Sequence, residues 1–197
     1  NPTASYTLSL HDALPISHVG GGTNSSEYEM LSSNSLMLMP SITPFNWLNL
    51  HKANSLVSNL KDLGYATLAA HPYTNSNYRR DSAWLTLGFD ETHFQDDFPT
   101  KETYGSRPYQ TDSATYRDLE GLYEAMPEDQ PRFVFLVSIQ SHGDYDMNPS
   151  EEDIVHAATD YGEYDSIMDE YLSNIYMTDR AFGELTEYLT EQYEKTG

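Results

Sequence analysis

The sequence predicts an α/β fold, because stretches with helical spacing of apolar residues alternate with short apolar runs that are typical of buried strands. One unit is complete: apolar residues at helical spacing in 55–63, a glycine at 64 that suits a helix end, and the run YATLAA over 65–70. The clearest strand is FVFLVSI, residues 133–139, which is apolar on both faces. Such a strand is expected at the centre of a sheet that helices cover on both sides.

Further helices are predicted where apolar residues recur on one face or where a start signal precedes them. They are a helix that begins at about Thr23, a short one over 82–87 that ends at Gly88, one over 112–126 and a long one over about 166–193. The segments 91–107 and 144–164 are polar and acidic, and we expect them to be loops. The sequence indicates neither an internal repeat nor a second domain.

The first 18 residues do not continue this pattern. We expect residues 1–18 to be a non-native leader, with an ordinary N-terminal arm as the alternative. His11 and Asp12 are therefore left out of the candidate site, and residues 19–197 are predicted to form one partial domain.

Charge limits the classes of partner. The 197 residues include 31 acidic and 10 basic side chains, for a formal net charge of -21. Such a surface disfavours DNA, RNA and anionic membranes, so no nucleic-acid partner is expected, and an anionic substrate must be held locally. The chain has no cysteine, which excludes disulfides and thiolate ligands, and it has no run of the ~20 apolar residues that a membrane-spanning helix needs.

The candidate nucleophile lies in GGGTNSSE, residues 20–27. Glycines allow positive φ and close approach to a ligand, and the Asn and Ser residues after Thr23 favour a helix start. Free N–H groups and the helix dipole favour an anion there, so the Thr23 hydroxyl could attack a phosphorus or sulfur atom. A Walker A motif is excluded because no Lys follows the glycines. A capped turn with no catalytic role is the alternative.

Two histidines follow the two predicted strands, His71 after the first and His142 after the second. Ligands of open α/β sheets bind at the carboxyl ends of the strands, so these imidazoles and Arg80, in the loop after His71, predict an anion site. The alternatives are structural histidines and solvated charges at Arg79 and Arg80.

These motifs together resemble the extracellular catalytic domain of the lipoteichoic acid synthase family, within the sulfatase and alkaline phosphatase superfamily. The matching stretches, in family order over about residues 19–197, are GGGTNSSEYEMLSSNSLMLMP, LKDLGYATLAAHPYTNSNYRRD, LGFD, FVFLVSIQSHGDYD and YLSNIYMTDRAFGELTEYL. The resemblance implies an incomplete three-layer α/β/α sandwich, the alkaline-phosphatase-like (sulfatase) fold.

The resemblance also implies a role for each candidate residue. Thr23 matches the family's nucleophile, which is also a ligand of a divalent metal, usually Mn. His71, Arg80 and His142 match residues that line the glycerol-phosphate pocket. Tyr78 stands where many members have Trp, so an aromatic wall is retained with a hydroxyl added. These side chains are expected to converge in one cleft at the carboxyl edge of the sheet.

The implied reaction is phosphoglycerol transfer. The Thr23 hydroxyl, activated by the metal, would attack a phosphatidylglycerol head group, and a polyglycerol-phosphate acceptor of lipoteichoic acid type would then take the group. The resemblance implies a place on the extracellular face of the cell membrane, with N-terminal membrane helices that are absent from this chain.

Two parts of the family's metal site have no counterpart in the sequence. The family needs a Glu at the end of an upstream strand and an Asp–His pair beyond the long helix, whereas only the leader-like segment precedes Gly20 and the sequence stops at Gly197. We therefore expect an internal fragment that is inactive alone and binds metal weakly. Two alternatives stay open: a superfamily hydrolase of phosphodiesters or sulfate esters, and a non-catalytic acidic binding module.

Overall fold

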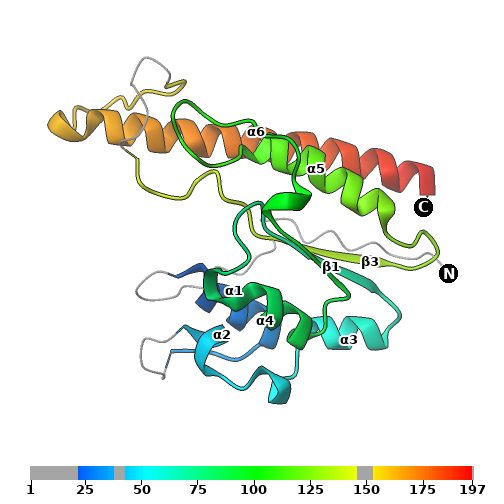
Figure 1. Cartoon of the computed structure of the whole chain (residues 1–197). Helices are drawn as coiled ribbons and strands as arrows, with labels where there is room; N and C mark the ends of the chain where they lie inside the picture. The colour runs from blue at the N-terminus through cyan, green and yellow to red at the C-terminus, as the bar shows by residue number, and fades with distance from the viewer. Residues whose placement is uncertain (1–21, 38–42, 146–152, 197) are drawn as a thin grey trace. The chain divides into compact units, whose positions relative to one another are not determined.

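The computed structural model describes residues 22–37, 43–145 and 153–196 (Figure 1). These residues divide into two units, each with its own packing. Unit 1 contains the chain up to Ala70 together with Thr74–His93 and Met126–Phe135, and unit 2 contains His71–Tyr73, Phe94–Ala125 and the chain from Leu136. The expected leader, and with it Gly20 and Gly21, lies outside the described residues.

Unit 1 is built on a three-stranded sheet with the strand order β2-β1-β3. Its elements are α1 (Thr23–Ser32), α2 (Pro44–Trp47), η1 (Leu50–Lys52), α3 (Leu56–Asp62), β1 (Ala66–Ala70), η2 (Asn77–Arg79), α4 (Arg80–Leu87), β2 (Glu91–His93) and β3 (Arg132–Leu136), whose last residue is assigned to unit 2. β1 is buried along its whole length and pairs in parallel with β2, with Leu68 opposite Glu91. The helix–glycine–strand unit expected over 55–70 is therefore confirmed.

The second predicted strand differs from expectation in length and place. β3 ends at Leu136, short of residue 139, and it lies at one edge of the described sheet, where β1 takes the central position. The prediction of a central strand was wrong for the described residues. Only Phe135 of β3 is buried, and it packs edge-on against Trp84 with ring centroids 6.0 Å apart. The apolar residues of β3 therefore serve aromatic contacts on one face of the strand, and the strand is not buried on both faces.

Two other local differences have simple causes. β2 was expected to be part of a loop, because its three residues are too few and too polar to show strand alternation. α4 begins at Arg80 rather than at Ser82 and ends at Leu87, followed by Gly88, whose φ of 116° favours glycine. Arg80 therefore belongs to a helix rather than to the loop in which the sequence placed it.

Unit 2 contains η3 (Gln95–Asp97), α5 (Asp112–Ala125), η5 (Gly162–Tyr164) and α6 (Asp165–Thr196). The two long helices agree with the predicted ranges to within a few residues, and α5 lies along α6 (Figure 1). The packed side of α6 includes fully buried polar residues, Glu170, Ser173 and Asn174, as well as Ala181. Among the helices that the structure describes, none combines the length and the apolar character that crossing a membrane would require.

Candidate functional site

Thr23 is the first residue of α1, and its side chain is exposed. Gly22 precedes it with a φ of 114°, a value that favours glycine, and the Gly22 carbonyl accepts the Ser25 N–H at 3.0 Å. No side chain caps this helix start and no acidic residue occupies its first turn. The predicted helix start is confirmed, and among the described residues no side chain caps its free N–H groups and positive dipole end, which suit an anion.

Arg80 is buried beside α1, where it pairs with Glu27. Its Nε lies 3.0 and 3.2 Å from the two carboxylate oxygens, and its Nη2 lies 2.5 Å from Oε1. Both side chains are 3% exposed. The indole N–H of Trp84 donates to Glu27 Oε2 at 3.1 Å, so the carboxylate receives donors from two residues of α4. Glu27 thereby ties α4 to α1 one helical turn after Thr23.

Burial raises the pKa of Glu27 above its usual range, and the Arg80 guanidinium and the Trp84 N–H oppose that rise. The edge of Arg80 that holds Nε and Nη2 is used by this pair. Nη1, on the far side of the guanidinium, makes no hydrogen bond to the described residues, so it is the group through which Arg80 could meet an anion.

Tyr78 and Arg79 both adopt left-handed backbone conformations, with φ of 58° and 56°. Such values are uncommon for residues other than glycine, and they often occur at ligand sites. The Tyr78 ring lies 5.1 Å from Arg80 Cζ and is 38% exposed, so it covers one side of the guanidinium and keeps contact with solvent. Arg79 is exposed, in line with the solvated charge weighed for it from the sequence.

The two candidate histidines lie in unit 2 and differ in exposure. His71 is buried, and its Nδ1 lies 2.7 Å from the Val137 carbonyl oxygen. His142 is exposed, and its Nδ1 lies 2.6 Å from the Gly143 carbonyl oxygen. A carbonyl can only accept, so both rings carry a proton on Nδ1, and the Nε2 of His142 is the nitrogen left for a ligand.

A row of aromatic rings connects these histidines. The ring centroids are 6.2 Å apart for His71 and Tyr73, 5.9 Å for Tyr73 and Tyr109, and 5.3 Å for Tyr109 and His142. The structure therefore links the buried His71 to the exposed His142 through successive ring contacts within unit 2. Neither tyrosine was predicted, because no sequence signal separates them from the other tyrosines among the 16 in the chain.

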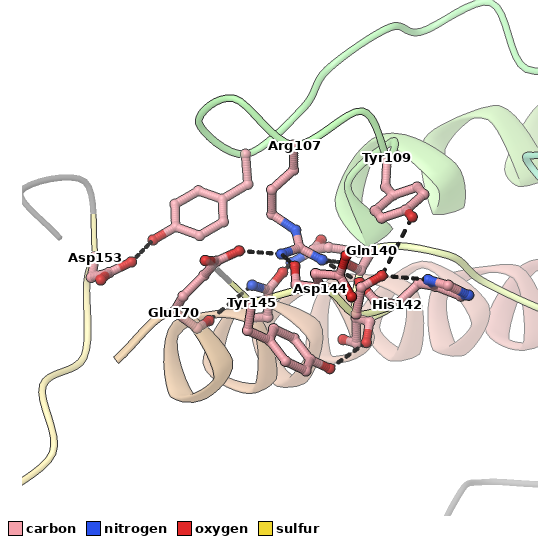
Figure 2. Close-up of polar contacts among 12 residues, drawn as sticks. Arg107, Tyr109, Gln140, His142, Asp144, Tyr145, Asp153 and Glu170 are labelled. Atoms are coloured by element: carbon pink, nitrogen blue, oxygen red, sulfur yellow. Dashed lines mark hydrogen bonds and ion pairs between the residues drawn. The ribbon is translucent and has the colours of Figure 1, made fainter. Parts of the chain in front are cut away.

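A second buried ion pair contacts the segment that carries His142. Arg107 pairs with Glu170 of α6 and also donates to main-chain carbonyl groups around His142 (Figure 2). The two partners are 63 residues apart in the sequence, and each reads as an ordinary surface charge. Sequence reasoning missed both for that reason.

The described residues do not assemble a metal site. None of the His, Asp and Glu side chains in residues 22–37, 43–145 and 153–196 form a group of three or more that could hold a metal ion. The exposed Thr23 hydroxyl suits a hard divalent cation as a single oxygen ligand, but such an ion needs several ligands, with carboxylates among them. The residues present thus fit one position of the expected coordination sphere and no more.

The predicted site residues are divided between the units. Thr23, Tyr78 and Arg80 belong to unit 1, where Arg80 contacts both Tyr78 and the helix of Thr23. His71 and His142 belong to unit 2, where the row of rings joins them. The expected single cleft therefore stays a prediction.

Proteins that are similar to this chain align with most of its length. A protein of Rhizobium meliloti (strain 1021), whose name assigns it provisionally to cyclic beta-1,2-glucan modification, is 23% identical over 179 residues, which are 90% of this chain and 27% of that protein. The lipoteichoic acid synthase LtaP from Listeria monocytogenes aligns with a TM-score of 0.68 at 22% identity, over 86% of this chain and 40% of LtaP. The Streptococcus pyogenes phosphoglycerol transferase GacH, solved with sn-glycerol-1-phosphate, aligns with a TM-score of 0.68 at 20% identity, over 87% of this chain and 45% of GacH. This chain thus spans less than half the length of each.

At these identities the structural alignments establish the fold and leave the activity open. The predicted alkaline-phosphatase-like fold is confirmed, with a parallel pair of strands and surrounding helices in the part of the chain that is described. The family model described as Sulfatase matches residues 15–197. Because this match takes in both units and every candidate residue, the chain belongs to the sulfatase family.

Proposed function

We propose that this chain is part of a metal-dependent phosphoglycerol transferase in which Thr23 is the nucleophile. The observation that carries the proposal is the exposed Thr23 hydroxyl at an uncapped helix start behind a glycine with positive φ. Main-chain N–H groups and the helix dipole at that position stabilise the negative charge of a phosphate. The fold shared with LtaP and GacH supports transfer chemistry of this class.

The reaction has two displacement steps. Thr23 Oγ forms a bond to the phosphorus of a phosphatidylglycerol head group, and the bond from phosphorus to the diacylglycerol oxygen breaks. The hydroxyl proton of Thr23 is lost in this step, and diacylglycerol leaves with a proton on its oxygen. A hydroxyl of a polyglycerol-phosphate acceptor then attacks the glycerophosphoryl group on Thr23, and the threonine hydroxyl is restored.

The remaining candidate residues bind the group that is transferred. Arg80 offers Nη1 to a phosphate oxygen, while Glu27 fixes the opposite edge of its guanidinium. His142 offers Nε2 to a phosphate oxygen or to a glycerol hydroxyl. Tyr78 supplies an aromatic wall beside Arg80, and His71 supports the ring row that ends at His142.

The cofactor in this proposal is a divalent metal, Mn, with Thr23 as one of its ligands and the others outside the described residues. When bound, such an ion polarises phosphoryl oxygens and favours loss of the threonine proton. A lipid substrate puts the catalytic domain at the cell membrane, and a polyglycerol-phosphate product puts it on the extracellular face.

Product analysis tests the proposal. The protein expressed from its complete open reading frame is incubated with Mn and vesicles of phosphatidylglycerol that carry label in the head group. We expect diacylglycerol to be released while the label passes to a polymer of glycerol phosphate, and we expect the intact protein to carry a glycerophosphoryl group on Thr23 when acceptor is withheld. Release of diacylglycerol with all of the label in free glycerol phosphate would show that the protein is a hydrolase rather than a transferase. No release of diacylglycerol would favour a binding module.

The acceptor has one further candidate. The Rhizobium meliloti relative, which matches 90% of this chain, is named for a modification of a glucan. A β-glucan added to the same reaction therefore serves as a second acceptor. Preferential transfer of the label to the glucan would mean that Thr23 is still the proposed nucleophile but that the product is a modified glucan.

A further inference from the structure

The segment of residues 140–145, here called the His142 loop, is held by its main-chain carbonyl groups (Figure 2). Each carbonyl from Gln140 to Asp144 accepts a side-chain hydrogen bond. The donors are Arg107 for Gln140, His142 and Asp144, Tyr145 for Ser141, and both Tyr109 and the His142 ring for Gly143. A loop fixed in this way presents its one exposed imidazole in a defined direction.

Arg107 is the centre of this arrangement. Its side chain is 1% exposed, and Glu170, which is fully buried on α6, accepts from Nη1. The same Nη1 donates to the Asp144 carbonyl at 2.8 Å, and Nη2 donates to the carbonyls of His142 and Gln140. Only the planar guanidinium can direct several donors at fixed angles, because a lysine ammonium is a compact point charge on a flexible stem.

The chain around Arg107 is itself fixed. Thr103 and Gln110, which flank Arg107 in the sequence, form an antiparallel β-bridge. The Arg107 N–H donates to the Tyr104 carbonyl at 3.1 Å. Tyr109 and Tyr145 lie on the guanidinium, with ring centroids 5.5 and 5.3 Å from Cζ. The guanidinium therefore has little freedom to move apart from the loop that it holds.

The contacts of Arg107 lie on both sides of Gly143, whose carbonyl contacts the His142 ring. Arg107 binds the carbonyls of His142 and Asp144, which lie on either side of Gly143 in the chain. The Gly143 carbonyl in turn accepts the Nδ1–H of His142 at 2.6 Å. The orientation of the Gly143 peptide therefore selects the Nδ1–H tautomer and leaves Nε2 as the ligand-binding nitrogen.

We propose that Arg107 is a positioning residue, which holds the His142 loop so that the His142 imidazole presents Nε2 to the substrate. The proposal rests on the proposed function, in which His142 binds the phosphate or the glycerol of the transferred group. A lysine at this position would keep a positive charge beside Glu170 but would lose the simultaneous contacts to the loop carbonyls. Arg107→Lys therefore separates the positioning role from the neutralisation of Glu170.

Kinetics of the protein from the complete open reading frame provide the first test. Arg107→Lys should raise KM for phosphatidylglycerol by about tenfold, the usual size for loss of a charge-assisted hydrogen bond, with a smaller change in kcat. Glu170→Gln is the matched control, because it keeps an acceptor for Nη1 and leaves the loop contacts in place, so it should change stability and leave KM near the wild-type value. In a His142→Ala background, Arg107→Lys should raise KM no further, because its effect passes through the imidazole.

Tautomer measurement provides the second test, on the chain itself. In 15N-histidine spectra, the signals lost in His142→Ala identify the ring, which should be the Nδ1–H form in the wild type and a mixture of tautomers in Arg107→Lys. An unchanged tautomer in Arg107→Lys, or effects of Arg107→Lys and His142→Ala on KM that simply multiply, would overturn the proposal. A changed tautomer together with a normal KM in His142→Ala would support the positioning role and reject the substrate role of His142, so the two failures are distinguishable.

Discussion

Each unit contains a buried Arg–Glu ion pair, and the two pairs differ in what else the arginine holds. Arg80 of unit 1 makes its hydrogen bonds to one side chain, Glu27, and lies against the rings of Tyr78 and Trp84. Arg107 of unit 2 pairs with Glu170 and binds three main-chain carbonyls of one loop. The first pair joins two helices, and the second shapes a loop.

The difference shows how one kind of interaction can serve two purposes. A pair between helices fixes where α1 begins relative to α4, and α1 begins with Thr23. A pair that extends into backbone fixes the direction of a single exposed ring. Charge neutralisation is common to both, so the two purposes separate only when the acids and the bases are changed one at a time.

The largest effect is expected from the nucleophile itself. Thr23→Ala should lower kcat by about a thousandfold or more, because each ~1.4 kcal/mol of lost barrier reduction is tenfold and several are lost. Both ion pairs remain in this variant, so its free energy of unfolding should stay near the wild-type value. Activity is measured as diacylglycerol release by the protein from the complete open reading frame. Turnover close to wild type would remove Thr23 from the mechanism.

The next effect compares the two acids directly. Glu27→Ala strands a buried guanidinium and should cost about 3–5 kcal/mol of unfolding free energy. Glu170→Ala should cost less, since Arg107 keeps its carbonyl acceptors in the His142 loop. Urea denaturation of both variants provides the measurement. Equal losses would mean that the loop carbonyls do not compensate Arg107.

Much of the fold, but little of the network around the site, could be predicted from the sequence. The start of α1 was predicted from its glycines and from Asn and Ser residues, although no side chain caps the helix, and α5 and α6 were predicted from apolar periodicity, because these are local signals. The edge position of β3 depends on which strands pair, which is a long-range property. Glu27 and Glu170 are buried only because an arginine from elsewhere in the chain reaches them, and no local pattern distinguishes them from solvated acids.

A smaller effect is expected when the arginine of unit 1 keeps its charge. Arg80→Lys retains a cation beside Glu27 but loses Nη1, the group proposed to bind the substrate phosphate, so KM for phosphatidylglycerol should rise by about tenfold. Stability should fall by less than in Glu27→Ala, because the charge of Glu27 stays neutralised. Parallel Michaelis and denaturation curves measure the two effects. A wild-type KM with reduced stability would restrict Arg80 to a structural role.

The pH dependence of stability sharpens the comparison further. Burial raises the pKa of Asp112, which is fully buried in unit 2, and burial also raises the pKa of Glu27 in unit 1. A raised folded pKa means that the folded protein binds the proton more tightly, so stability is lost as pH rises through that value. Urea midpoints should therefore fall as pH rises above the ordinary carboxyl range of about pH 4, and Asp112→Asn should flatten part of the slope. A slope unchanged by Asp112→Asn would mean that Asp112 does not contribute to it.

The smallest effect is expected from added metal. Calorimetric titration of the 197-residue chain with Mn should show weak binding that salt removes, because the described residues form no group of three or more His, Asp or Glu ligands and the net charge of -21 attracts cations diffusely. The two ion pairs should be unaffected by the titration. A stoichiometric, salt-resistant, micromolar site would mean that the chain contains ligands that were not recognised.

Each unit is assembled from separated segments of the sequence, which limits how fragments of the protein can be expressed. Unit 1 draws its last strand from residues after 126, and by then the chain has already supplied α5 to unit 2. Neither unit exists as an uninterrupted stretch of gene, so no pair of cloning boundaries isolates one of them. A nascent chain released before Arg132 lacks β3, and one released before α6 lacks Glu170, the partner of Arg107. Fragment complementation would thus have to split this protein across both units at once.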